Sequence, residues 1–175
     1  NPSLSSNGFP IGGLRGCVQS IQKIVRETKP DRIFICWDGA GGSTKRKQMK
    51  KDYKSGRKPI RLNRAVRNMT EQEETDNKIW QQTRLMEYYN SMPIQQFMFQ
   101  GTEADDIIAI ASKYFSEQGH NVFIVSSDTD LVQLVNDKVK IFDLKMKEVA
   151  PKISPEMDLK LKIIIGDKSD NIPAI

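Results

Sequence analysis

Short apolar runs alternate with segments of helical periodicity along this chain, and this alternation limits its fold more than any other feature. Residues 32–37 and 121–126 are continuous apolar runs, the pattern of strands buried on both faces, and residues 94–99 and 139–142 indicate two further strands. Helical periodicity and helix-end signals mark the segments around these strands, over residues 12–28, 70–92, 102–119, 131–135 and 154–166, and Thr70 with Glu73 resembles a capping box at the start of the second segment. Alternating helices and buried strands predict a mostly parallel sheet covered on both faces by helices, which is an α/β domain.

The size of the chain and its lack of long apolar runs bound the class of protein. With 175 residues, of which 38% are hydrophobic, residues 1–175 are expected to form a single compact domain. No apolar run approaches the roughly 20 residues that span a bilayer, and the residues from Asn1 onward lack the charged and apolar regions of a signal peptide. The sequence therefore predicts a soluble, cytoplasmic protein with no membrane partner.

Acidic side chains follow the predicted strands. Asp38, Glu103 and Asp128 each come just beyond the carboxyl end of one of them. Because the carboxyl ends of parallel strands lie at one edge of a sheet, these residues are expected to converge there. Further acids extend the group: Asp105, Asp106, Asp130, Asp167 and Asp170. So many carboxylates resist ionising together unless cations neutralise them, and oxygen ligands favour Mg²⁺ or Mn²⁺, so the sequence predicts a metal site.

A simpler interpretation is open for each acid taken alone. Aspartate is common at helix N-termini and in turns, and Thr102 with Asp105 could form no more than a capping box. Repetition of acids at three strand ends and in a terminal loop favours the metal site.

Two narrower alternatives explain less of the pattern. Asp128 and Asp130, taken with the later motif 166–170, resemble the aspartate motifs of haloacid-dehalogenase-like phosphatases, but fewer than forty residues separate the two motifs. That scheme also gives Asp38 and Glu103 no role. An EF-hand loop beginning at Asp128 fails because valines stand at positions 135 and 139, where calcium needs oxygen ligands.

Residues 45–67 carry most of the positive charge. They hold eleven Lys or Arg against one acid, Asp52, so this segment has a net charge of +10 in a chain of net charge +5. Arg46, Lys50, Lys54 and Arg57 recur at spacings of three and four, so a helix here would carry a cationic stripe that could follow a phosphate backbone. The alternative is a solvated helix face. The uneven charge favours a polyanionic partner, of which nucleic acid is the commonest.

Five short motifs, in order along the chain, resemble those of one nuclease family. They are Trp37-Asp38-Gly39; Lys45-Arg46 with Tyr53-Lys54-Ser55-Gly56-Arg57; Gly101-Thr102-Glu103-Ala104-Asp105-Asp106; Ser127-Asp128-Thr129-Asp130-Leu131; and Gly166-Asp167-Lys168-Ser169-Asp170-Asn171-Ile172-Pro173. Each motif alone is weak, but the ordered set resembles the 5′–3′ exonuclease and flap endonuclease family. That family includes the N-terminal nuclease domain of bacterial DNA polymerase I and the bacteriophage 5′-exonucleases, some of which are called ribonuclease H.

The resemblance implies a PIN-like three-layer α/β/α domain that binds two Mg²⁺ or Mn²⁺ ions. The first ion, or its water, would be held by Asp38, Glu103, Asp105, Asp128 and Asp130. Asp167 and Asp170 would serve the second ion. Asp106 is kept as a further metal ligand, because helical geometry places it on the same face as Glu103.

The same resemblance gives the basic segment a role. Lys54 and Arg57 match residues that approach the scissile phosphate, and together with Asp128 and Asp130 they are the predicted catalytic residues. Tyr53 matches a position suited to stacking on a base, and residues 44–72 would form a basic arch over the active site. The predicted nucleic-acid-binding residues are Arg46, Lys50, Tyr53, Lys54, Arg57 and Lys58.

The activity that the resemblance implies is two-metal hydrolysis of phosphodiester bonds in DNA, giving a 5′-phosphate and a 3′-hydroxyl, in replication and repair. The expected substrate has a 5′ end, flap or nick, with an RNA–DNA hybrid as a further substrate if RNA primers are removed. Replication proteins are expected partners of a monomeric enzyme, and a phage-encoded protein would act in the host cytoplasm.

The chain departs from the family pattern at both ends. The family begins with a central strand ending in Asp upstream of Asn1, and Ala174 stands where the family has a glycine before a helix-hairpin-helix. The domain is therefore expected to be incomplete at both ends and to lack its first central strand, so that the 175 residues could be inactive by themselves. A non-catalytic nucleic-acid-binding relative of the same fold is the alternative function.

Overall fold

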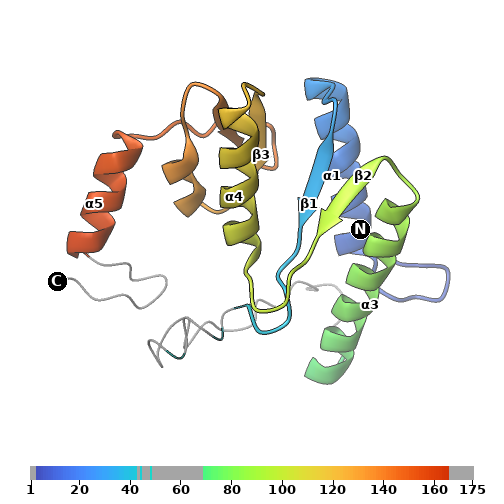
Figure 1. Cartoon of the computed structure of the whole chain (residues 1–175). Coiled ribbons are helices and arrows are strands. Elements are labelled where there is room, and N and C mark those ends of the chain that lie inside the picture. Colours follow the sequence, from blue (N-terminus) through green and yellow to red (C-terminus); the bar gives the residue numbers. More distant parts are fainter. Residues whose placement is uncertain (1–2, 43, 45–47, 49–68, 166–175) are drawn as a thin grey trace. The chain divides into compact units, whose positions relative to one another are not determined.

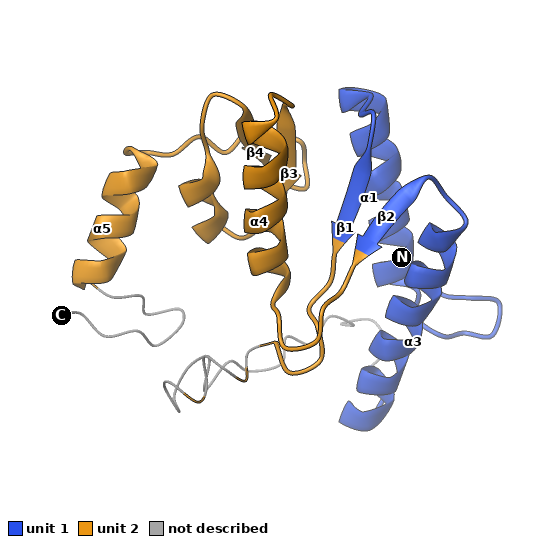
Figure 2. Ribbon diagram, in the orientation of Figure 1, with its two compact units in different colours: residues 1–35, 58–96 blue, residues 36–57, 97–175 orange. Residues whose placement is uncertain are grey.

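The computed structural model describes residues 3–42, 44, 48 and 69–165. It divides into two compact units, residues 1–35 with 58–96 and residues 36–57 with 97–175, each of which is described by itself (Figure 2). The single domain indicated by the sequence stays a prediction. No helix in these described ranges is long and apolar enough to cross a membrane.

The first unit contains α1 (Gly12–Thr28) and α3 (Glu71–Asn90), together with all but the last residue of β1 (Ile33–Cys36) and of β2 (Ile94–Phe97) (Figure 1). Strand β1 is hydrogen-bonded to β2. Helices α1 and α3 contact each other, and the Leu14 N–H donates to Gln81 Oε1 at 3.0 Å between them. Among the described residues of this unit, the buried ones are Pro10, Ile21, Leu85, Tyr89 and Ile94.

Local sequence signals set the ends of these helices. The Thr70 hydroxyl accepts from the Glu73 N–H at 3.2 Å, and Glu73 Oε2 accepts from the Thr70 N–H at 2.7 Å. This reciprocal pair is the predicted capping box at the start of α3, which is confirmed. Helix α1 ends at Thr28, because the next residue, Lys29, has a left-handed φ of 44° that breaks the helical path before Pro30.

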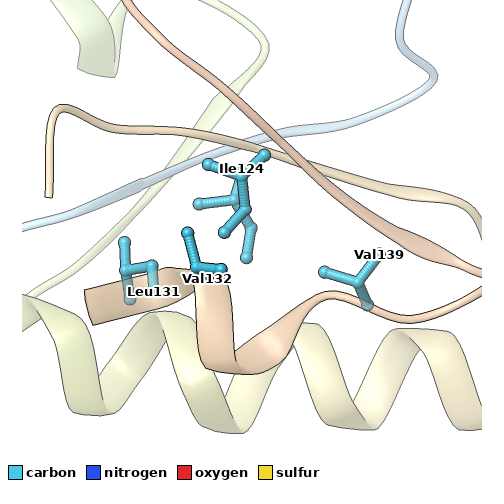
Figure 3. Close-up of a cluster of buried hydrophobic side chains, with 5 residues drawn as sticks. Ile124, Leu131, Val132 and Val139 are labelled. Carbon is cyan, nitrogen blue, oxygen red and sulfur yellow. The ribbon is translucent and has the colours of Figure 1, made fainter. Parts of the chain in front are cut away.

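The second unit contains α4 (Ala104–Glu117), β3 (Val122–Val125), the 3₁₀ helix η1 (Asp130–Leu134), β4 (Val139–Phe142) and α5 (Pro155–Ile165). Strands β3 and β4 run parallel, in register from Val122 opposite Val139 to Val125 opposite Phe142. Five buried residues form the core: Ile124, Leu131, Val132, Val139 and Ile141 (Figure 3). Ile108 of α4 packs against this core, so the helix and η1 cover one face of the β3–β4 sheet.

The other face of this sheet is exposed at Phe123, which differs from what the sequence predicts. Residues 121–126 were expected to form a strand buried on both faces, yet Phe123 is 46% exposed while its neighbour Ile124 is 5% exposed. Side chains alternate between the faces of a strand, and the core of this unit contacts only the face that carries Ile124 and Ile141. The prediction of two buried faces is therefore wrong for β3 within the described chain.

The pairing of the strands differs from the single, mostly parallel sheet that the sequence predicts. In the part of the chain that the structure describes they form two two-stranded sheets, β1 with β2 and β3 with β4. The α/β class is confirmed, and parallel pairing is confirmed for β3 and β4. That a first central strand is missing stays a prediction.

Candidate functional site

Two loops that are far apart in sequence are joined by backbone hydrogen bonds around Asp38. The Trp37 N–H donates to the Phe97 carbonyl at 2.8 Å, and the Gly39 N–H donates to the Thr102 carbonyl at 3.0 Å. Gly39 has to be glycine, because a Cβ atom there would lie 1.7 Å from the Phe99 carbonyl oxygen. The close approach of the two loops fixes the position of the residue between Trp37 and Gly39.

Asp38 and Glu103 are brought together by this loop pair. Asp38 Oδ1 accepts a hydrogen bond of 2.8 Å from the N–H of Ala104, the first residue of α4. Glu103 is the residue before it and is buried, and a Cβ atom on Gly42 would lie 3.2 Å from its side chain. Two acids from different predicted strand ends therefore meet at the start of α4.

The start of α4 also settles the capping alternative. Glu103 stands at the N-cap position and its side chain makes no capping hydrogen bond, so the capping box considered for Thr102 and Asp105 is wrong. The carboxylate that binds the first turn comes instead from Asp38, 66 residues earlier. An anion at a helix N-terminus is favourable, so Asp38 stabilises α4 whatever else it binds.

Asp128 and Asp130 form a second acidic pair, after β3. Asp128 Oδ1 accepts from the Asp130 N–H at 2.8 Å, and the Asp128 N–H donates to Ser126 Oγ at 3.0 Å. These bonds hold the two aspartates in a tight turn at the start of η1. Asp130 Oδ1 in turn accepts from the ammonium of Lys162 on α5.

The other predicted metal ligands are only partly placed. Asp105 and Asp106 lie in the first turn of α4 and are half-buried. No three His, Cys, Asp or Glu side chains of the described residues form a group that could hold a metal ion. Asp38 bonds to Ala104, the residue after Glu103, and Asp128 bonds to Asp130. Asp167 and Asp170 lie outside the described residues.

The predicted nucleic-acid contacts also lie outside the described residues, namely Arg46, Lys50, Tyr53, Lys54, Arg57 and Lys58. Their roles stay predictions. The sequence reasoning missed Lys162, which directly contacts a predicted metal ligand. A usable signal was its position four residues after Asp158 on one helix face, which indicates an ion pair but not the contact with Asp130.

A family model described as the N-terminal resolvase-like domain of 5′–3′ exonucleases matches residues 1–160 of the chain. A 5′–3′ exonuclease of Aquifex aeolicus is 27% identical over 186 residues, which cover 99% of this chain and 58% of the relative. The corresponding protein of Mycoplasmopsis pulmonis is 30% identical over 167 residues, covering 90% and 50%. DNA polymerase I of Caldicellulosiruptor bescii is 29% identical over 189 residues, covering 99% and 20%. The chain thus spans 20–58% of the length of these relatives.

Solved structures of bacteriophage T5 proteins share this fold. The T5 flap endonuclease, solved with DNA and metal ions, matches with a TM-score of 0.72 and 22% sequence identity, over 93% of this chain and 61% of that one. The T5 5′-exonuclease with bound zinc ions gives a TM-score of 0.73 at 22% identity, again over 93% and 61%. At this identity the similarity shows the fold alone.

Proposed function

This chain belongs to the 5′–3′ exonuclease family and has its PIN-like α/β fold, and on that premise we propose that it is the core of a divalent-metal-dependent 5′-nuclease. The proposed reaction is hydrolysis of DNA phosphodiester bonds from a 5′ end or at a 5′ flap, leaving a 5′-phosphate and a 3′-hydroxyl. The observation that supports the proposal most is the hydrogen bond that the Ala104 N–H, at the start of α4, donates to Asp38, next in sequence to the buried Glu103 and inside the region that matches the family.

The donor chemistry of the predicted site suits a hard divalent ion. All its candidate ligands are carboxylates, without His or Cys, and oxygen donors of this kind select Mg²⁺ or Mn²⁺. We propose two ions, held by the residues predicted from the sequence: Asp38, Glu103, Asp105, Asp106, Asp128, Asp130, Asp167 and Asp170. When bound, such ions lower the pKa of a water ligand and neutralise charge on the phosphoryl oxygens.

The protein's own groups would bind and orient the substrate. Lys54 and Arg57 would offset negative charge that develops on the phosphoryl oxygens, and Tyr53 would stack on the neighbouring base. Arg46, Lys50 and Lys58 would bind backbone phosphates along the basic segment. The hydrogen bond from the Asp130 N–H to Asp128 would keep those two carboxylates oriented.

The proposed substrate is DNA with a 5′ end, flap or nick, and an RNA–DNA hybrid is a second substrate to be tried. Several similar proteins support this choice, because they are named as 5′–3′ exonucleases and DNA polymerases I. We propose a monomer that acts in the cytoplasm with replication proteins.

The proposal is tested with the intact protein, a labelled 5′-flap duplex and Mg²⁺ or Mn²⁺. Asp128→Ala should abolish cleavage and leave DNA binding in place. Asp128→Asn should lower the rate by about a hundredfold or more, because it retains the oxygen that accepts from the Asp130 N–H but loses the charge needed for an ion.

Asp137→Asn is the matched control, since Asp137 is an exposed acid in the loop after η1 and should keep wild-type activity. DNA binding with no cleavage under either ion would reject the nuclease and support the alternative, a non-catalytic nucleic-acid-binding relative. Equal activity in the Asp128→Asn and Asp137→Asn proteins would reject the site assignment.

A further inference from the structure

Lys162 on α5 makes an ion pair with Asp130 that no sequence motif indicated. Its ammonium donates to Asp130 Oδ1 and lies 3.8 Å from Asp158 Oδ2. Asp130 is 32 residues away in sequence and starts η1, whereas Asp158 lies one turn earlier on α5 itself. One lysine side chain therefore joins a carboxylate of the predicted metal set to a second carboxylate on its own helix.

The neighbouring pair on α5 shows what an ordinary helix-surface ion pair looks like. Lys160 donates to Glu156 at 2.6 Å, at i,i+4 spacing on the same helix, with the two side chains 61% and 78% exposed. Such exposed pairs contribute little to stability. The Lys162 side chain is only 29% exposed and its partner Asp130 is 44% exposed, so the Lys162 pair is better shielded from solvent and links two elements.

We propose that Lys162 is the internal counter-ion of Asp130 and is exchanged for a divalent cation when the metal site loads. The inference rests on the proposed function, because it takes Asp130 as a metal ligand. An ammonium bonded to Asp130 Oδ1 lowers the affinity of that carboxylate for a divalent ion, since the two positive charges repel at short distance. In the exchange that we propose, the ion takes the place of Lys162 at Asp130.

Asp158 supplies the place to which the displaced ammonium moves. It is already within 3.8 Å of Lys162 Nζ, so the charge stays paired after the exchange. The link from α5 to η1 through Asp130 is lost at the same moment. Metal binding is thereby coupled to the attachment of α5, the helix that directly precedes Asp167 and Asp170 in the sequence.

The exchange is tested by Mn²⁺ binding to the intact protein, measured by titration calorimetry and by the electron paramagnetic resonance signal of free Mn²⁺. Lys162→Met removes the competing ammonium and keeps the length of the side chain, so Mn²⁺ should bind about two- to fivefold more tightly than to the wild type. Lys160→Met is the matched control, because it removes the same charge from the same helix without touching Asp130; its Mn²⁺ affinity should stay close to that of the wild type.

A second measurement reports the stability of α5 in the protein without added metal. Amide exchange of α5 should be faster in Lys162→Met than in Lys160→Met, since only the first loses the link to η1.

The outcomes separate this inference from the proposed function. Equal Mn²⁺ affinity in the two variants, or weaker binding to Lys162→Met, would overturn the exchange and leave the metal site standing. Absence of Mn²⁺ binding in the wild type and both variants would overturn the proposed function and the exchange with it.

Discussion

At the scale of single residues, the loop after β1 depends on the absence of one side chain. Gly39 is buried, and its N–H bonds the Thr102 carbonyl while its α-carbon approaches Phe99. The neighbouring Asp38 is exposed at the surface and still reaches the Ala104 N–H. Asp38 can therefore bind α4 only while the two loops stay in close contact.

Gly39→Ala should destabilise the protein by about 3 kcal/mol, because a methyl group 1.7 Å from a backbone oxygen forces the loops apart. The measurement is urea unfolding of the intact protein. Gly16→Ala is the control: Gly16 lies inside α1, and a Cβ atom added there would meet nothing within 4 Å, so alanine should stabilise by about 0.5–1 kcal/mol. Similar stability changes in the two variants would contradict the proposed crowding at Gly39.

The capping box of α3 should make stability depend on pH. The hydrogen bond from the Thr70 backbone N–H holds the pKa of Glu73 below its usual value of 4.5. Because the folded pKa is the lower one, the contribution of Glu73 is present above the unfolded pKa and is lost as the pH falls through the folded pKa. Glu73→Gln should therefore lower the melting temperature at pH 7, and the difference from wild type should vanish in acid.

Thermal unfolding between neutral pH and pH values below the folded pKa of Glu73 measures this effect. Glu71→Gln removes another acid of the same first turn but leaves the bonds to Thr70 intact, so its pH-dependent difference should be smaller. A difference at Glu73 that persists unchanged in acid would show that its charge is not the cause.

At the scale of elements, the core of the second unit lies on one face of a two-stranded sheet. Ile124 of β3 and Ile141 of β4 stand opposite each other and pack with Leu131 and Val132 of η1 (Figure 3). The turn that holds Asp128 and Asp130 leads directly into η1. Packing of η1 against this core therefore fixes the position of Asp130, the first residue of η1, and of the turn that joins it to Asp128.

Ile141→Ala should cost about 2–5 kcal/mol of unfolding free energy, because Ile141 is fully buried and its truncation leaves a cavity. Ile110→Ala is the control on α4: Ile110 is 70% exposed, so the change should stay within about 0.5 kcal/mol. Chemical denaturation with comparison of midpoints and slopes checks both. A small effect at Ile141 would mean that the core can close over the lost atoms.

At the scale of the whole chain, charge is concentrated in one segment. Residues 45–67 carry +10, so the rest of the chain carries −5. A polyanion would be attracted to that segment and repelled by most of the remainder. The predicted binding of DNA should therefore be strongly weakened by salt.

Lys54→Ala should reduce the slope of log binding constant against log salt concentration by about 1, because one phosphate contact is lost. Fluorescence anisotropy of labelled flap DNA at several salt concentrations gives this slope. Lys138→Ala, outside the basic segment and exposed before β4, should leave the slope unchanged. An equal change in both variants would argue that net charge, and not the segment, governs binding.

Local chemistry allowed the sequence by itself to determine the kind and order of the elements and the family. The limits of α1 match the predicted residues 12–28, and the Thr70–Glu73 capping box forms as expected, because both depend on residues that are neighbours in the chain. The motifs around Asp38, Glu103 and Asp128 are short and ordered, so they could be read without a fold. The family match over residues 1–160 confirms that resemblance.

Only the tertiary structure decided which of these residues meet. Asp38 contacts Ala104 across 66 residues, Lys162 contacts Asp130 across 32, and Phe123 is exposed because its side of β3 faces away from the core. A sequence pattern shows the spacing of residues within one helix or strand. It does not show that the two loops approach each other at Gly39 or that α5 packs against η1. Contacts between distant segments depend on how the helices and strands pack, so only the packing of α5 and η1 determines that Lys162 is the partner of Asp130.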